Sequence, residues 1–369
     1  MIEKKPLSNI LQFKNGKKRP KDIGTVPVYG GNGILGYANA GNSKECVIIG
    51  RVGAYCGSVY FEKNDCWISD NAIGAYARNN TDIVYAYYLL KSQCLNERRI
   101  GTSQPLLTQE ILNNIEVPIL SYNEQIKVGR FLGKIDEKIE LNTKINENLL
   151  QQALAIYKAW FCDFVLSDGV LPESWHITTI DALSSLVTRG IAPKYDNSSN
   201  QIVLNQKCIR DHTIDVSLAR RHLPKKINEK WVSKGDLLIN STGTGTLGRV
   251  AQVWFDANNM TVDSHVTIVR PKAPILQSYI GFWGLSHESE IEAQHTGSTG
   301  QTELPRDRVK AMELPLPDED TLSKFNELVI PMTDAVVSNQ KENAQLSQLR
   351  DTLLPKLMSG EIDVAELEL

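Results

Sequence analysis

The sequence predicts an α+β fold in which two globular mixed α/β domains are separated by two long, antiparallel-packed α-helices. Two observations lead to this prediction: a heptad pattern that occurs twice, and β-type runs with turn signals ahead of each copy. The first copy advances in alternating steps of three and four through Val128, Leu132, Ile135, Ile139, Asn142, Asn146, Leu149, Ala153, Ile156 and Trp160. The second copy has the same spacing, at Phe325, Val329, Met332, Val336, Asn339, Asn343, Leu346, Arg350, Leu353 and Leu357.

Asparagines occur at matching positions in the two apolar seams. Asn142 and Asn146 of the first copy align with Asn339 and Asn343 of the second. A single polar seam residue is common in exposed helices, but a buried asparagine fixes helix register at a cost in stability. Because both positions recur, we interpret the chain as an internal duplication with pseudo-two-fold symmetry. The helices are expected to pair through Ile135, Ile139, Asn142, Asn146, Leu149, Met332, Val336, Asn339, Asn343 and Leu346.

Start and stop signals divide the chain into four consecutive segments. Residues 1–120 form the first domain, 121–165 the first helix, 166–317 the second domain, and 318–369 the second helix with an acidic tail. Ser121 and Glu124 form a capping box, so the first helix is expected to start there and to reach about Phe164. About 40 residues at 1.5 Å each make a rod of roughly 60 Å. The second helix is expected from about Thr321 to Ser359, with Pro331 near its first turns.

The two domains repeat the same order of short elements. The first has strand-like runs at 26–29, 46–49 and 58–61 and a helical run at 83–98. In the second, 235–239 mirrors 45–49, 263–265 lies near the place of 69–71, and 278–292 repeats the helical run. Leu304 and the 314–316 run match Leu107 and the 117–119 run.

Composition limits the function classes without deciding between them. Hydrophobic residues make up 41% and charged residues 22%, which is ordinary for a globular chain. No uncharged apolar run of membrane-spanning length is present, and the six cysteines form no C-x-x-C pair, so we expect reduced thiols in a cytoplasmic protein. The net charge is −3, yet residues 1–120 carry 14 Lys and Arg against 10 Asp and Glu. The tail from 317 carries 4 against 11, which suits a protein partner or solubility better than a phosphate backbone.

One glycine-rich segment imitates a cofactor motif. Residues 243–248 match G-x-G-x-x-G, but a β-type run at 249–255 follows, whereas a dinucleotide site requires a helix there. We therefore interpret it as a tight turn between strands, with its counterpart at 50–57. No Walker loop, zinc-protease motif, nucleophile elbow or amino-methyltransferase motif is present, and the six histidines lack metal-ligand spacing. We expect no catalysis, metal or cofactor in this chain.

Polar and basic side chains in the loops form the candidate recognition surface. Arg, Asn and Gln read base edges, while Lys, Ser, Thr and backbone amides hold phosphates. For any single residue a solvated loop is the better interpretation, but recurrence in both domains favours binding. The candidates are Lys14, Lys17, Lys18, Arg19, Gly31, Asn32, Gly33, Tyr37, Arg51, Tyr55 and Gln104 in the first domain, and Arg189, Lys194, Asn240, Ser241, Thr242, Thr244, Thr246, Arg249 and Gln301 in the second.

Specific segments now indicate a family. Residues 28–37 read VYGGNGILGY, 48–53 read IIGRVG, and 123–125 read NEQ at the start of the first helix. With the repeated helices, the whole chain resembles the specificity (S) subunit of a type I DNA restriction–modification system. The resemblance carries Gly31, Asn32, Gly33, Arg51 and Gly53 over as loop positions, with expected counterparts Asn240, Thr242, Gly243, Gly245 and Arg249. At the second helix Asp320, Thr321 and Leu322 replace the NEQ triplet, so docking there is expected to differ in detail.

The resemblance also implies partners and chemistry. Each domain would be a target recognition domain for one half of a split double-stranded DNA site, and the helices would dock two methyltransferase (modification) subunits. S-adenosylmethionine, ATP and Mg would be bound by those partners and by restriction subunits, with methylation at adenine N6. A duplicated chain with diverged domains suits two unlike half-sites, as a symmetric dimer suits a palindrome.

Two other functions remain open from the residues alone. The chain could be a helical scaffold whose globular domains bind peptides or glycans, which predicts no salt-sensitive DNA binding. It could also be a nucleotide-dependent enzyme that uses residues 243–248.

Overall fold

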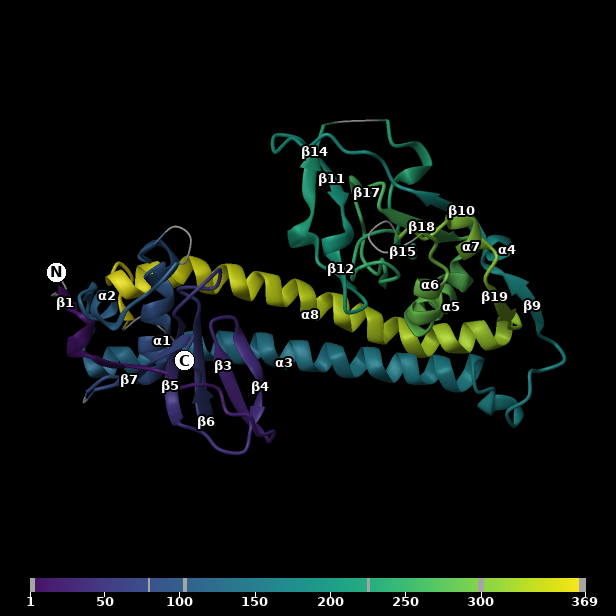
Figure 1. Cartoon of the computed structure of the whole chain (residues 1–369). Coiled ribbons are helices and arrows are strands. Elements are labelled where there is room, and N and C mark those ends of the chain that lie inside the picture. The colour runs from purple at the N-terminus through teal and green to yellow at the C-terminus, as the bar shows by residue number, and fades with distance from the viewer. Residues whose placement is uncertain (1–3, 79, 102–104, 224–225, 298–301, 365–369) are drawn as a thin grey trace. The chain divides into compact units, whose positions relative to one another are not determined.

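The computed structural model describes residues 4–78, 80–101, 105–223, 226–297 and 302–364, which fall into two compact units (Figure 1). Unit one comprises Met1–Leu141 and Glu342–Leu369, and unit two comprises Asn142–Lys341. The long helices α3 (Tyr122–Phe161) and α8 (Glu319–Ser359) therefore each contribute residues to both units. Each compact unit thus consists of one globular domain and the parts of both long helices that pack on it.

A six-stranded sheet forms the globular part of unit one. Its order is β2-β7-β5-β6-β3-β4, and all neighbours are antiparallel except β3 with β6. A separate antiparallel pair joins β1 to β8. The strands are β1 (Lys4–Pro6), β2 (Leu11–Asn15), β3 (Val26–Gly30), β4 (Gly33–Ala38), β5 (Ser43–Gly50), β6 (Val59–Ile68), β7 (Ala72–Ala77) and β8 (Glu116–Pro118); the short helices are η1 (Leu7–Asn9), α1 (Ile83–Ser92), η2 (Leu95–Glu97) and α2 (Gln109–Asn113).

The core of unit one lies between this sheet, α1 and the long helices. Val47 and Ile49 of β5 pack in one buried cluster with Leu89 of α1, Val128 of α3 and Leu357 of α8. Asp82 caps α1 by accepting a hydrogen bond from the Tyr85 backbone amide (2.7 Å). The alternating apolar pattern of the strands and the apolar seams of the helices thus supply one continuous core.

Unit two has a four-stranded sheet of order β10-β18-β15-β16 and a three-stranded sheet of order β14-β11-β17. Two further pairs join β9 to β19 and β12 to β13. The strands are β9 (His176–Thr179), β10 (Ser184–Arg189), β11 (Gln201–Leu204), β12 (Ile209–Arg210), β13 (Thr213–Ile214), β14 (Arg220–His222), β15 (Leu237–Asn240), β16 (Val250–Gln252), β17 (Met260–Val262), β18 (Val266–Pro271) and β19 (Glu313–Leu316). The short helices are η3 (Val165–Ser167), α4 (Ile180–Leu183), η4 (Gln206–Cys208), η5 (Val216–Leu218), η6 (Asn228–Lys230), η7 (Pro274–Leu276), α5 (Gln277–Ser286), α6 (Glu288–Ala293) and α7 (Arg306–Lys310).

Aromatic side chains dominate the core of unit two. The ring of Phe161 on α3 lies 5.0 Å from the rings of both Phe325 on α8 and Tyr279 on α5, measured between centroids. Tyr157 and Phe282 extend the same cluster. Edge-to-face pairs of this kind stabilise a core beyond the area that they bury. They fasten the end of α3 and the start of α8 to the second globular domain.

Equivalent backbone contacts confirm the internal duplication. Gly16 follows β2 and donates its amide hydrogen to Ala72 O (3.0 Å), and Gly190 follows β10 and donates to Val266 O (3.1 Å). A Cβ atom added to either glycine would lie 1.9 Å from a backbone carbonyl oxygen. Two domains with little sequence in common therefore require glycine at the same point of the fold, because the neighbouring chain passes equally close in both.

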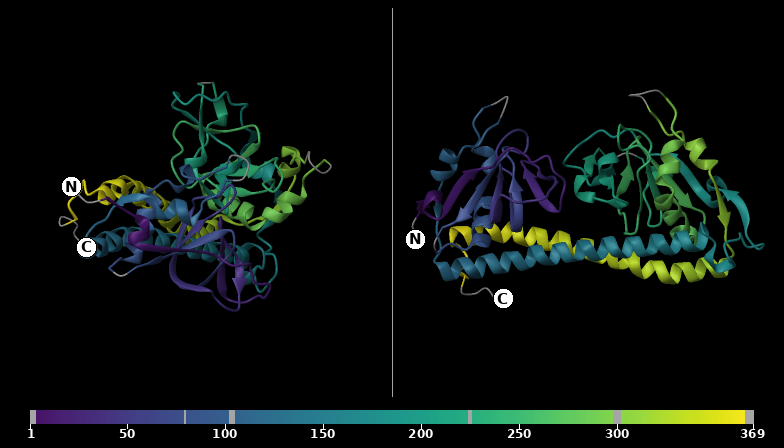
Figure 2. Two further views of the ribbon diagram at one scale, coloured as in Figure 1. Left: turned by 60° about the vertical axis from the view of Figure 1, so that its left-hand side comes forward. Right: turned by 60° about the horizontal axis from the view of Figure 1, so that its bottom comes forward.

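Within each unit α3 and α8 lie side by side and run in opposite directions (Figures 1 and 2). In unit one Arg350 pairs with Asp136 (2.5 Å), and Asn343 Nδ2 donates to Ile139 O (3.3 Å). In unit two Asn339 Nδ2 donates to Asn146 Oδ1 (2.8 Å). Asn142, Ile135 and Val336 are buried; Leu149, Met332 and Leu346 are partly buried.

Several predicted boundaries shift for local reasons. The capping box is present, with Ser121 N donating to Glu124 Oε2 (2.8 Å). Helix α3 ends at Phe161, before the expected Phe164, whose φ of +50° is left-handed. Helix α8 begins at Glu319, before the expected Thr321, because Asp318 accepts from the Thr321 amide (2.8 Å) and caps it. It continues through Pro331 to Ser359.

The two shorter helical runs are each interrupted. The run predicted at 83–98 ends at Ser92, since Cys94 adopts a left-handed φ of +46° before η2. The run predicted at 278–292 is divided at His287 into α5 and α6. All six cysteines are free thiols, and four of them are buried. Within the described part of the chain no helix is both long and apolar enough to span a bilayer.

Candidate nucleic-acid interface

Three segments of unit one meet at one end of the sheet: the turn after β3, the loop after β5 and the turn before β7. The Arg51 amide donates to Asn71 O (2.9 Å), and the Ser69 amide donates to Tyr29 O (2.9 Å). The loop after β5 then returns to β6 through Gly57 N, which donates to Gly50 O (2.8 Å). These bonds join backbone groups only, so they hold the three segments together whatever side chains the segments carry.

Unit two repeats this meeting point with different residues. The Ser241 amide donates to His265 O (2.8 Å), and the Asp263 amide donates to Leu204 O (2.9 Å). Gly248 N donates to Asn240 O (2.8 Å), as Gly57 N does to Gly50 O. The three loops of the second domain are therefore the structural counterparts of those of the first.

A fourth segment completes each meeting point. In unit one Leu107 N donates to Arg51 O (2.9 Å), and in unit two Leu304 N donates to Ser241 O (2.8 Å). Ahead of each leucine, Ile100 bridges to Leu106 in unit one and Thr296 bridges to Glu303 in unit two. The predicted match of Leu107 with Leu304 is confirmed. Gln104 and Gln301, which were predicted from the same stretch, lie outside the described residues.

The glycine-rich loop of unit two is a turn between antiparallel strands. It connects β15 to β16, and Gly243, Gly245 and Gly248 have φ values of +102°, +72° and +85°. The corresponding loop of unit one has Gly53 at +76° and Gly57 at +94°. No helix begins after residues 243–248, so the arrangement that binds a pyrophosphate at a helix N-terminus does not form there. This contradicts the enzyme alternative based on that motif.

The backbone correspondence corrects the predicted pairing of loop residues. Arg51 occupies the position of Ser241, because both donate their amides across the same junction, and Arg249 occupies that of Ser58. Gly53 corresponds to Gly243, since each carbonyl accepts from the amide three residues on. The expected set of counterparts therefore contains the equivalent of Gly53, but its arginine, Arg249, is not the equivalent of Arg51.

Most predicted residues of unit one lie at the surface. Lys14, Lys17, Lys18, Arg19, Asn32, Tyr37 and Tyr55 are exposed, with Tyr55 at 59%. Gly31 and Arg51 are partly covered, and Gly33 is buried. The Arg51 Nε is buried and has no hydrogen-bond partner among the described residues. The guanidinium of Arg51 is therefore directed at least partly inward, away from the exposed surface of the loop.

Two residues of unit two that were predicted to lie on the recognition surface are buried. Asn240 and Ser241 are both 0% exposed. Asn240 Nδ2 donates to Gln206 O (3.2 Å), and the Ser241 hydroxyl bonds the Thr267 hydroxyl (2.6 Å). These polar side chains fasten the loop to the sheet from beneath, so a ligand at the surface cannot reach them.

The remaining predicted residues of unit two divide into exposed and internally bonded groups. Lys194 and Thr244 are exposed, and Arg249 is partly exposed. The Thr246 hydroxyl donates to Gly243 O (3.3 Å) within its own loop. Arg189 is held inside the domain, because it donates to Leu304 O (2.9 Å) and pairs with Glu303 (2.5 Å).

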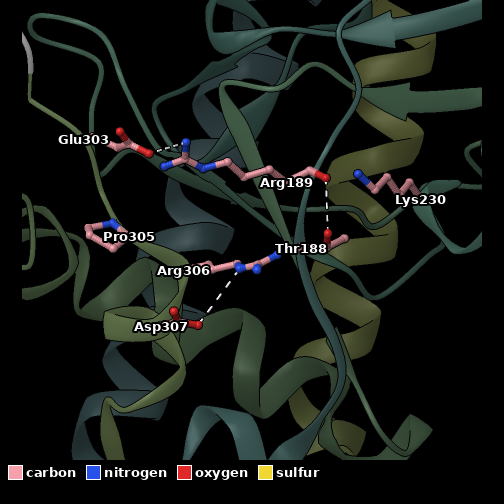
Figure 3. Close-up of a pocket in the computed structure, with 7 residues that line it drawn as sticks. All are labelled: Thr188, Arg189, Lys230, Glu303, Pro305, Arg306 and Asp307. Atoms are coloured by element: carbon pink, nitrogen blue, oxygen red, sulfur yellow. Dashed lines mark hydrogen bonds and ion pairs between the residues drawn. The ribbon is translucent and has the colours of Figure 1, made fainter.

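A cationic pocket of about 370 Å³ adjoins Arg189 (Figure 3). Lys230 and Arg306 join Arg189 around it, together with the carboxylates of Glu303 and Asp307. The Lys230 ammonium donates to Gly190 O (3.1 Å), and Arg306 lies 4.0 Å from Asp307. Sequence patterns did not indicate this pocket, since its residues come from three separated segments.

The predicted Thr242 belongs to a polar cluster on the surface of unit two, whose other members, Gln206 and His265, the sequence did not single out as site residues. Gln206 Nε2 donates to the Thr242 hydroxyl (2.6 Å), which in turn bonds His265 Nδ1 (2.8 Å). The neighbouring Asp263 Oδ1 accepts from the His265 amide (2.9 Å), and burial raises the pKa of that carboxyl even though this bond opposes the shift. The segment 263–265 had been noted as a repeat, and its histidine was the available signal.

Part of the chain matches a known family of DNA specificity domains. Residues 2–151 match the family described as "Type I restriction modification DNA specificity domain". The MjaIX specificity subunit of a type I restriction enzyme from Methanocaldococcus jannaschii is 27% identical over 307 residues, covering 77% of this chain and 70% of that protein. The HindI specificity subunit from Haemophilus influenzae is 22% identical over 342 residues, covering 72% and 73%.

A solved structure shares the fold along the whole chain. The S subunit of a type I restriction–modification system from M. genitalium superimposes with a TM-score of 0.65 at 18% identity, covering 97% of this chain and 96% of that one. The predicted fold class is confirmed. Together with the sequence matches, this makes the chain similar to specificity subunits of type I restriction–modification systems.

Proposed function

We propose that this chain recognises a bipartite double-stranded DNA site, with each globular domain reading one half-site. The observation that carries the proposal is the recurrence of one four-segment meeting point in both units, built from backbone bonds and covered by different side chains. Two unlike half-sites require a shared backbone frame, here the hydrogen bonds that join the four segments, with different side chains on its surface. Base edges in the major groove present distinct donor and acceptor patterns, so side chains on such a frame can distinguish them.

Cations near the meeting points would supply the sequence-independent part of the affinity. Lys14, Lys17, Lys18 and Arg19 are exposed where β2 leads into the turn region of unit one. Arg306 and Lys230 line the pocket of unit two. Phosphate contacts release counterions, so binding through these residues falls steeply as salt rises. The scaffold alternative, in which the domains bind peptides or glycans, predicts no such dependence on DNA and salt.

We propose further that α3 and α8 dock methyltransferase subunits. Both helices expose large apolar side chains, among them Leu141, Ile145 and Leu328, which a docked partner would cover. A groove of about 390 Å³ on α3 includes Ile145 and Leu149. The methyltransferase subunits and restriction subunits are proposed to bind S-adenosylmethionine, ATP and Mg. Catalysis is proposed to take place in those subunits.

The decisive experiment changes the length of the helices at the unit boundary. One heptad inserted after Leu141 of α3 and one after Lys341 of α8 preserves the apolar seams and adds about 10 Å of helix. If the helices set the distance between half-sites, the gap in the recognised sequence should grow by roughly 3 base pairs at 3.4 Å each. Selection from a randomised DNA library by the chain with its modification subunits measures the gap.

A matched control inserts the same number of flexible residues in the connection after Phe164, outside both helices. That control should leave the gap unchanged. An unchanged gap in the helix variant, with both half-sites still selected, would refute the spacing role. A library that yields no bipartite sequence with the wild-type chain would refute DNA recognition itself.

A further inference from the structure

We propose that three structurally equivalent positions in each unit determine which bases are read: Gln206, Thr242 and His265 in unit two, and Gly31, Val52 and Asn71 in unit one. The proposal rests on the DNA recognition proposed above and assigns it to particular side chains. Of these six residues, only Gly31 and Thr242 were among the candidates that the sequence suggested.

The equivalence of Gly31 and Gln206 follows from the backbone, because each lies two residues after the carbonyl that accepts from the third segment, Tyr29 O from Ser69 N and Leu204 O from Asp263 N. In unit two the Gln206 amide donates to both the backbone oxygen and the hydroxyl of Thr242 (2.6 Å each). In unit one a Cβ atom added to Gly31 would lie 3.5 Å from Val52 O and 3.7 Å from Asn71 O. The first position therefore lies against the second in both units.

In the second segment of each unit, the residue before the proposed position is directed inward and the position itself is more exposed. Ser241 is fully buried and bonds Thr267, whereas its neighbour Thr242 is only partly buried. Arg51 buries its Nε, whereas its neighbour Val52 is 36% exposed. His265 and Asn71, the corresponding residues of the third segment, are both exposed. Each triad is thus the outward layer over a buried support.

The proposal gives His265 the tautomer in which Nδ1 accepts a hydrogen bond. The Thr242 hydroxyl accepts from Gln206 and can donate its own proton to His265 Nδ1. A histidine whose Nδ1 accepts carries its proton on Nε2, and this nitrogen has no partner among the described residues. The triad therefore presents one oriented N–H donor, which fits the N7 or O6 acceptor of a purine in the major groove.

Unit one presents different chemistry on the same frame. Position 31 has no side chain, Val52 offers two methyl groups, and Asn71 offers an amide with both a donor and an acceptor. An asparagine amide pairs with N6 and N7 of adenine, and an aliphatic group contacts the C5-methyl of thymine. The triad of unit one therefore suits an A·T pair. The triad of unit two suits the N7 or O6 acceptor of a purine and does not require an A·T pair.

The test is selection of a randomised DNA library by the complete chain with its modification subunits. His265→Ala should weaken the preference at one base pair of one half-site by about tenfold, the value of one lost contact of modest strength. Asn71→Ala should do so in the other half-site. Thr242→Val, which keeps the volume but removes the hydroxyl, should relax the same base pair as His265→Ala. His176→Ala, an exposed histidine on β9, is the matched control and should change nothing.

Three results would overturn the assignment. The first is an unchanged preference in both His265→Ala and Asn71→Ala. The second is an effect of both variants on the same half-site. The third is a Thr242→Val variant that behaves as wild type while His265→Ala does not, which would exclude the oriented tautomer. Library selection reports preference directly, so loss of methylation does not hide any of them. A wild-type chain that selects no bipartite sequence would count against the proposed function instead.

Discussion

The hydrogen bond between Asn339 and Asn146 is expected to stabilise the pairing of α3 and α8 in unit two. The perturbation is a double-mutant cycle of Asn146→Ala, Asn339→Ala and the two together. Asn339 Nδ2 lies 2.8 Å from Asn146 Oδ1, a normal distance for a neutral amide pair. Asn146 also donates to Val336 O, but at 3.5 Å this second bond is too long to contribute much.

The magnitude follows from the chemistry of the pair. A neutral hydrogen bond in a partly buried site contributes about 1 kcal/mol net, because its groups would otherwise bond water. Each single variant should lower the free energy of unfolding of unit two by about 1–2 kcal/mol, since it also leaves the other amide without its partner. The coupling energy of the cycle should be about 1 kcal/mol.

Native-state hydrogen exchange of helix amides is the suitable assay, since two compact units need not unfold together. Amides of 142–161 and 319–341 should show the coupling, and amides of the sheet in unit one should not. Gln151→Ala, on the exposed face of the same helix, is the control and should change exchange little. A coupling energy below about 0.3 kcal/mol would show that the bond does not hold the helices together.

Further predictions concern one ion pair with a buried carboxylate, two closely packed glycines and a helix cap. Arg270→Met leaves the carboxylate of Asp236, only 1% exposed, without its partner at 2.7 Å and should destabilise unit two by about 3–5 kcal/mol in thermal or denaturant unfolding. Gly16→Ala should destabilise unit one alone, and Gly190→Ala unit two alone, by about 1–3 kcal/mol, as hydrogen exchange in each unit would show. Asp318→Ala should cost about 1 kcal/mol at neutral pH. The backbone hydrogen bond at the start of α8 holds the pKa of Asp318 below its ordinary value, so this stabilisation should be present above about pH 4 and disappear as pH falls through the lowered pKa. Wild type and variant should then converge in acid melts, and a difference that persists at low pH would contradict the role of the carboxylate.

The helices were predictable because their signals are local and periodic. The seam repeats every seven residues, and the capping box at Ser121 lies within four residues, so both can be read without knowing the fold. The exact ends were less predictable. Phe164 and Cys94 carry no sequence signal for the left-handed conformation that ends or interrupts a helix, since it is imposed by the packing that follows.

The surface was harder to predict than the frame, because residue type does not reveal which way a side chain points. Asn240 and Ser241 were chosen as polar loop residues, yet both are buried and bonded. Arg189 was chosen as a cation, but its partners at 303 and 304 are more than a hundred positions away along the sequence. Gln206 and His265 were missed because isolated polar residues in unrelated segments form no pattern until the chain folds.

The division between a backbone frame and outward side chains leads to a last prediction. If the frame is independent of the residues that it carries, the triad of unit two should function in unit one. Gly31 has no left-handed φ, and a Cβ added there would make only ordinary contacts of 3.5 Å or more, so Gly31→Gln is sterically allowed. With Val52→Thr and Asn71→His, the half-site of unit one should acquire the purine preference of unit two at the corresponding base pair. The same three substitutions with Asn71→Phe in place of histidine are the control, because they keep a ring but remove the donor. If the histidine and phenylalanine versions select the same bases, the N–H donor does not read the site. The side chains of the unit-two triad then do not transfer their base preference to the backbone of unit one.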